Sequence, residues 1–95
     1  MPAYAVFTRD ETVDPDQLNE YFAKVDASFD GHPMKLLADY GTFETLEGEE
    51  IEGAVIIEFP DMDAARAWYR SPEYQAIAQH RFKGSRYRGF IVNAT

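Results

Sequence analysis

The stretch Ala67-Trp68-Tyr69-Arg70-Ser71-Pro72-Glu73-Tyr74 decides the fold of this chain. The hydroxyl of Ser71 can accept a backbone N–H at a helix start, and Pro72 suits the first helical position, where a missing N–H costs nothing. The segment therefore predicts one helix that ends near Arg70 and a second, short helix that runs from Pro72 to about Phe82.

Outward from this break, strand and helix patterns alternate along the chain. Alternating apolar residues predict strands at 3–9, 34–43, 53–59 and 86–93, with a polar loop at 10–12 and a bulge or bend at Gly41. Asp14, followed by Pro15 and by Gln17 in the capping-box position, predicts a further helix that ends at Asp30-Gly31. The order βαββαβ with right-handed crossovers predicts an α+β, ferredoxin-like fold, in which a four-stranded antiparallel sheet carries its helices on one face. Residues 1–95 are predicted to form a single domain of this kind.

Composition and charge exclude several classes of protein. With 45 % hydrophobic residues the chain can build a core, and no apolar run approaches the roughly 20 residues that span a bilayer. The net charge of −8 disfavours a nucleic-acid partner. The start of the chain has neither a basic region nor an apolar signal core, so we expect a cytoplasmic protein with no membrane association.

The sheet is predicted to be apolar on both faces. In the third strand Val55, Ile57 and Phe59 lie on one face and Ala54 and Ile56 on the other. Helices on one side leave the second face open, and an apolar surface of that size is uncommon on a soluble monomer. We therefore expect a homodimer through the sheet face; the alternative is a monomer whose loops cover the sheet.

An ordered set of residues links this chain to a known family. Its members are Tyr4, Asp14-Pro15, Tyr21, Gly31, Leu46-Glu47-Gly48, Glu58-Phe59-Pro60, Ala65, Trp68, Ser71-Pro72-Glu73-Tyr74 and Arg81. Together they resemble the family called domain of unknown function 1330, which belongs to the dimeric α/β-barrel superfamily. The resemblance implies a dimeric α/β barrel with a cleft between sheet and helices, and no assigned reaction. Asp39-Tyr40 depart from the family's Arg-Gly, so that an acid replaces a base.

Two charged residues are the candidate catalytic groups. Glu58 lies mid-strand among apolar neighbours, where a carboxylate is costly unless paired, and a carboxylate with a shifted pKa can act as a general acid or base. The alternative is a buried structural ion pair with Arg81, Arg86 or Arg88, or an acceptor for the backbone amides of a loop. Arg81, about three turns after the helix break, can point into the cleft and bind a carboxylate bidentately, or it can be a cation that complements the helix dipole.

The candidate ligand-binding residues are Trp68, Tyr74, Asp39 and His80. Trp68 and Tyr74 can line an aromatic pocket, although their helical spacing equally suits core packing. His80 can titrate near neutral pH, or it can be a surface or capping residue. We expect no metal site, since the chain has no cysteine and only two histidines, and no cofactor.

Two functional hypotheses follow. In the first, the protein binds or converts a small aromatic or carboxylate-bearing metabolite without a cofactor, in a cleft that contains Glu58 and Arg81. In the second, it is a non-catalytic dimeric interaction or regulatory module.

Overall fold

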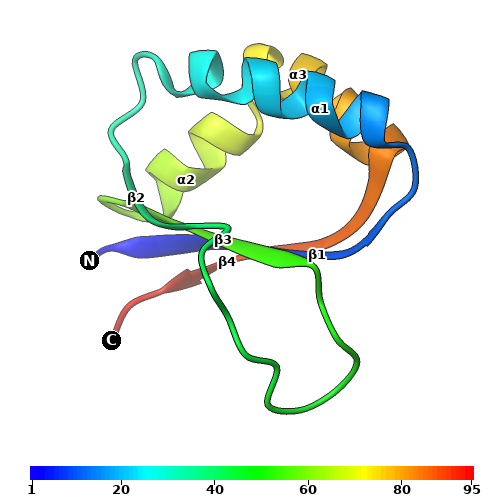
Figure 1. Cartoon of the computed structure of the whole chain (residues 1–95). Helices are drawn as coiled ribbons and strands as arrows, with labels where there is room; N and C mark the ends of the chain where they lie inside the picture. The colour runs from blue at the N-terminus through cyan, green and yellow to red at the C-terminus, as the bar shows by residue number, and fades with distance from the viewer.

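The computed structural model describes residues 1–95, in which a four-stranded sheet lies beneath a layer of helices (Figure 1). The strands are β1 (Ala3–Thr12), β2 (Lys35–Asp39), β3 (Gly53–Phe59) and β4 (Ser85–Asn93). The helices are α1 (Pro15–Lys24), the 3₁₀ turn η1 (Val25–Phe29), α2 (Met62–Tyr69) and α3 (Pro72–Gly84). All neighbouring strands are antiparallel, in the order β2-β3-β1-β4. The predicted α+β, ferredoxin-like fold is confirmed.

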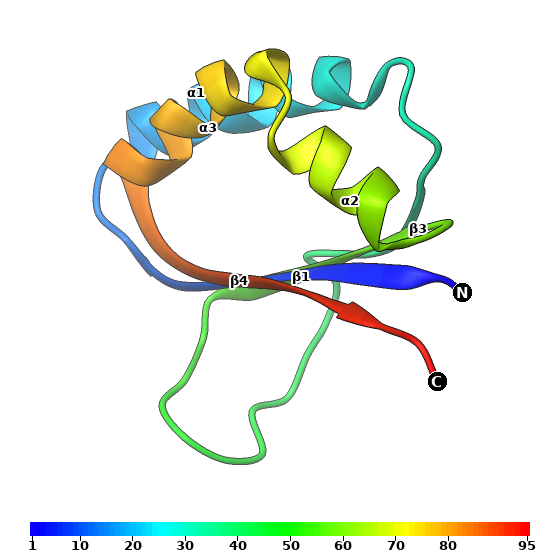
Figure 2. The same ribbon diagram turned by 180° about the vertical axis from the view of Figure 1, so that it is seen from behind.

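The predicted helix break lies at Ser71. The backbone N–H of Tyr74 donates to Ser71 Oγ at 3.2 Å, and the same hydroxyl donates to the carbonyl of Trp68 at 2.8 Å. One side chain therefore caps the start of α3 and the end of α2, and the two helices change direction there (Figure 2). α3 continues two residues past the predicted end, to Gly84, and leads directly into β4.

The largest differences from the predicted strand boundaries are at the ends of β1 and β2. Residues 10–12 belong to β1, because Glu11 and Thr12 pair with Arg86 and Ser85 of β4 beyond a register shift. β2 ends at Asp39 and not at residue 43. A bulge or bend was expected at Gly41; the chain bends at the neighbouring Tyr40, whose φ is 56°, and the strand irregularity lies between Leu36 and Ala38.

One face of the sheet packs against the helices and forms the core. The buried cluster consists of Ala5, Phe7, Tyr21, Ile57, Phe59, Ala65, Trp68, Tyr74 and Ala78. Its members come from β1, β3 and the helices, so the core lies between the two layers. None of the helices has the length and apolar character that crossing a membrane requires.

The opposite face of the sheet, called the open face below, carries no helix (Figures 1 and 2). Strand alternation and register place on it Tyr4, Val6, Thr8, Lys35, Ala38, Ala54, Ile56, Glu58, Arg88, Phe90 and Val92. Phe90 is 56 % exposed and Val92 46 % exposed, so the chain's own loops do not cover this face. The predicted second apolar face is therefore present.

Candidate functional site

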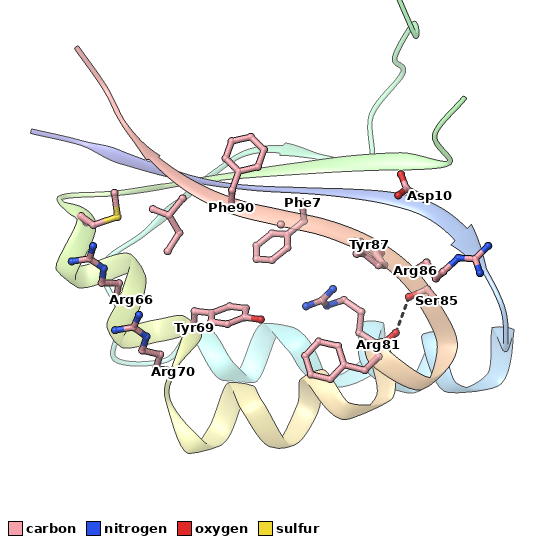
Figure 3. Close-up of a pocket in the computed structure, with 14 residues that line it drawn as sticks. Phe7, Asp10, Arg66, Tyr69, Arg70, Arg81, Ser85, Arg86, Tyr87 and Phe90 are labelled. Carbon is pink, nitrogen blue, oxygen red and sulfur yellow. Dashed lines mark hydrogen bonds between the residues drawn. The ribbon is translucent and has the colours of Figure 1, made fainter. Parts of the chain in front are cut away.

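A cavity of about 760 Å³ opens between the helices and the β1–β4 side of the sheet. Phe7 of β1, Tyr87 of β4, Tyr69 at the end of α2, and Arg81 and Phe82 of α3 line it (Figure 3). Figure 3 shows the guanidinium of Arg81 extending from α3 into this space, towards the rings of Phe7 and Tyr69. A cavity of this volume falls within the usual range for small-molecule sites.

Arg81 is a buried cation without an anion. Only 6 % of the residue is exposed, none of the five ion pairs of the structure includes it, and its Nε has no hydrogen-bond partner. Its guanidinium carbon lies 4.8 Å from the ring centre of Tyr87, 4.9 Å from that of Phe82 and 5.3 Å from that of Phe7. Rings supply some stabilisation by cation–π attraction, but a buried charge is normally paired. Burial lowers the pKa of Arg81, while the Tyr74 and Tyr21 oxygens raise it by more, so the guanidinium stays charged.

The mouth of the cavity is also basic. Arg66, Arg70 and Arg86 line it, against the single carboxylate of Asp10. Asp10 already accepts a hydrogen bond from Arg88 Nε at 3.1 Å. Arg66 pairs with Asp63 and Arg86 with Glu11, so Arg70 and Arg81 are the cations of this cavity that have no ion pair, and these two favour an anionic ligand.

A second cavity, of about 410 Å³, lies on the β2–β3 side of the same interlayer space. Trp68, Asp39 and Tyr40 line it, and Phe7 lines both cavities. The hydroxyls of Tyr40 and Tyr87 lie 2.7 Å apart and join the walls of the two cavities. The single cleft predicted from the sequence is thus divided in two.

Trp68 and Tyr74 belong to the core, as the alternative interpretation held. They are 1 % and 0 % exposed, and their ring centres are 4.2 Å apart. Trp68 Nε1 donates to Ser28 Oγ at 3.1 Å, and the hydroxyls of Tyr74 and Tyr21 are 2.9 Å apart, so the polar ends of both rings are satisfied inside the protein. Trp68 borders only the second cavity and Tyr74 neither, and a ligand role for them stays a prediction.

Neither of the other two predicted ligand-binding residues lines the Arg81 cavity. Asp39 is exposed at the edge of the second cavity. Nδ1 of His80 is 2.8 Å from Gln17 Oε1, so His80 links α3 to α1 and lines neither cavity. Gln17 is therefore engaged with His80, and the structure shows no capping-box bond from its side chain.

Glu58 lies on the open face, and the prediction that it shares a cleft with Arg81 is wrong. Its neighbours in the strand, Ile57 and Phe59, point into the core, so alternation turns Glu58 to the opposite side of the sheet. There it pairs in register with Tyr4 and Lys35. A catalytic role for Glu58 stays a prediction that belongs to the open face, separate from the Arg81 cavity.

The sequence analysis missed the aromatic residues that do surround Arg81, namely Phe7, Tyr69, Phe82 and Tyr87. Tyr69 stands next to Trp68 in the stretch that decides the fold, and its position before the helix break was the available signal. The structure contains no group of three or more His, Asp or Glu side chains that could hold a metal ion.

The family model described as "Domain of unknown function (DUF1330)" matches residues 2–95. The chain belongs to the DUF1330 family. No curated protein matches it.

Solved structures with the same fold come from several bacteria. The RPA0582 protein of unknown function from Rhodopseudomonas palustris is 20 % identical, with a TM-score of 0.75 over 99 % of this chain and 82 % of that one. A dimeric ferredoxin-like protein of unknown function from Jannaschia sp. CCS1 is 13 % identical, with a TM-score of 0.73 over 99 % and 100 % of the two chains. SnoaB, a cofactor-independent oxygenase from Streptomyces nogalater, is 17 % identical, with a TM-score of 0.63 over 99 % and 93 %. At these identities the DUF1330 chain shares the fold with them.

Proposed function

We propose that this DUF1330 protein is a cytoplasmic homodimer that binds or converts a small aromatic or carboxylate-bearing metabolite at Arg81, without a cofactor. The observation that carries the proposal is the buried guanidinium of Arg81, which has neither an acidic partner nor a hydrogen bond at Nε.

The chemistry of the cavity supports an acidic ligand with an apolar body. A guanidinium binds a carboxylate through two parallel hydrogen bonds, and such charge-assisted bonds are about twice as strong as neutral ones. The rings of Phe7, Tyr69 and Phe82 offer stacking surface beside that anchor. A bound carboxylate therefore compensates the buried charge and places its apolar part against aromatic walls.

The homodimer is supported by the open face and by the relatives. Phe90 and Val92 expose apolar side chains on a face that nothing in the chain covers. The Jannaschia protein, and a protein of this fold from Thermobifida fusca, are described as dimeric. A second copy packed face to face about a two-fold axis removes this surface from water.

Conversion of the ligand is supported by the description of SnoaB as a cofactor-independent oxygenase on the same fold. The second hypothesis, a non-catalytic interaction or regulatory module, draws its support from the exposed open face. Chromatographic analysis of any ligand after incubation with the protein separates the two, because only an enzyme yields a product.

A thermal-shift screen of aryl carboxylates and phenols tests the proposed site. We expect ligands that raise the Tm of the wild type and lose this effect in Arg81→Gln. Hydrogen bonds to charged groups contribute about 1.5–3 kcal/mol, so the affinity of an acidic ligand should fall at least about tenfold.

Lys24→Gln is the matched control, because its side chain is exposed, paired with Glu20 and outside both cavities. Without ligand, circular dichroism should show that Arg81→Gln keeps the native fold. A broad library without a hit, or a hit that stabilises Arg81→Gln equally, contradicts the proposal.

A further inference from the structure

Residues 40–52, called the arm below, connect β2 to β3 without any helix or strand of their own. Both ribbon views show the arm extending away from the sheet on the side opposite the helices, beyond the open face (Figures 1 and 2). Structureless connections of this length are uncommon in compact domains and usually have a function.

The base of the arm is fixed to the sheet. The backbone N–H of Tyr40 donates to the carbonyl of Ala54 at 2.9 Å, and that of Glu52 donates to the carbonyl of Arg9 at 2.7 Å. The carboxylate of Glu52 also accepts from Thr12 Oγ1 at 2.6 Å and from Arg9 Nε at 3.1 Å. These bonds hold both ends of the arm and therefore set the direction in which it leaves the sheet.

The outer part of the arm carries apolar side chains that nothing in this chain covers. Leu46 is 86 % exposed, more than any other large hydrophobic residue, and Phe43 is 42 % exposed. Gly48, with φ +86°, turns the chain back, and Thr45 Oγ1 donates to Glu50 Oε2 at 3.3 Å across the turn. The arm thus presents an exposed leucine on a turn that is bonded to itself.

The charges of the arm and of the open face indicate which surface the arm contacts. Between Gly41 and Gly53 the arm has five glutamates and no base. The open face has two basic residues, Arg88 and Lys35. Arg88 pairs only with Asp10, in an exposed ion pair of the kind that contributes little, so it is available to a second acid.

We propose that the arm docks on a second copy of this chain, with Leu46 packed against the partner's apolar open face and the arm glutamates next to the partner's Arg88. The inference rests on the proposed homodimer and extends it. In a two-fold dimer, the arm of each subunit packs on the sheet of the other, so the interface includes these two contacts as well as the flat contact between the open faces. The contact covers Leu46 and adds continuous surface to the interface.

Sedimentation equilibrium over a dilution series tests the arm. We expect Leu46→Ser to raise the dimer Kd at least about tenfold, because each dimer loses two buried leucines. Val13→Ser is the matched control, since Val13 is 58 % exposed in the connection between β1 and α1, away from the open face, and should leave Kd unchanged. Circular dichroism melts of both variants confirm that they fold.

A second measurement reports on the contact directly. The chain has no cysteine, so Leu46→Cys provides one thiol for an environment-sensitive fluorophore. Its emission should shift to the blue at concentrations where the protein is dimeric and return to the red on dilution.

The variant Phe90→Asp on the open face distinguishes failure of the arm proposal from failure of the proposed homodimer. If Phe90→Asp is monomeric while Leu46→Ser keeps the wild-type Kd and the label does not shift, the arm proposal fails and the sheet-face dimer stands. If the wild type is a monomer at every concentration, both fail.

Discussion

At the scale of single residues, Gly84 shows how closely two helices can approach. A Cβ at this position would lie 2.6 Å from the backbone nitrogen of Leu18 and 2.9 Å from the carbonyl oxygen of Asp14. The carbonyl of Gly84 also accepts the backbone N–H groups of Val13 and Asp14, at 2.8 and 2.9 Å. The end of α3 therefore rests directly on the start of α1, and only a hydrogen fits between them.

We expect Gly84→Ala to lower the free energy of unfolding by about 1–3 kcal/mol, because backbone atoms must shift to admit the methyl group. For a domain of this size each kcal/mol corresponds to roughly 4–8 °C in Tm. Gly41→Ala is the control, since no atom lies within 4 Å of its added Cβ, and it should stay within about 0.5 kcal/mol of the wild type. Equal losses in the two variants would count against the close contact.

Tyr40 is the other residue where the backbone constrains the side chain. Its φ of 56° lies in the left-handed region that favours glycine. The ring is held under the guanidinium of Arg9, 5.3 Å away, and against Phe22, 5.5 Å away, and its hydroxyl bonds Tyr87. These contacts offset the unfavourable backbone and divide the interlayer space into two cavities.

At the scale of elements, the junction of α2 and α3 depends on one hydroxyl. Ser71→Ala removes both the cap of α3 and the bond to the carbonyl of Trp68, and should cost about 1 kcal/mol. Ser71→Thr keeps the hydroxyl and should stay closer to the wild type. Chemical denaturation of the three proteins compares them, and an unchanged midpoint for Ser71→Ala would show that the junction does not need the cap.

At the scale of the whole molecule, burial of tyrosines makes stability depend on alkaline pH. Burial raises the pKa of Tyr21, Tyr40 and Tyr74. The neighbouring hydroxyl of Tyr74 raises the pKa of Tyr21 further, and that of Tyr87 raises the pKa of Tyr40. The charge of Arg81 opposes the rise in the pKa of Tyr74. A raised folded-state pKa means that the neutral form is favoured by folding. The resulting stability is complete below the unfolded tyrosine pKa of about 10 and is lost as the pH rises above it.

We therefore expect Tm, at constant protein concentration, to fall as the pH rises above about 10. Phenolate absorbance should show three of the six tyrosines ionising only together with the loss of native circular dichroism. In urea all six should titrate near pH 10. A native spectrum with all six tyrosines ionised near that pH is the contrary outcome.

Much of this architecture was predictable from the sequence because its signals are local. Asp14 and Ser71 each accept a backbone N–H at the helix starts that their positions predicted. The strand 53–59 was predicted to the residue, and the two apolar faces follow from its alternation alone. Glu11 and Thr12 were missed because their strand conformation depends on pairing with β4, which lies more than 70 residues away in the chain.

What the sequence alone determined, then, is the order of the elements, the helix break and the excess of apolar surface on the sheet. The tertiary structure decided which side chains meet. Glu58 and Arg81 both looked like cleft residues, but Glu58 turns to the open face, while Phe7, Tyr69 and Tyr87 converge on Arg81 from three different elements. Caps and periodicity act within a few residues, whereas a binding site is formed by segments that only the packing of helices on a sheet brings together.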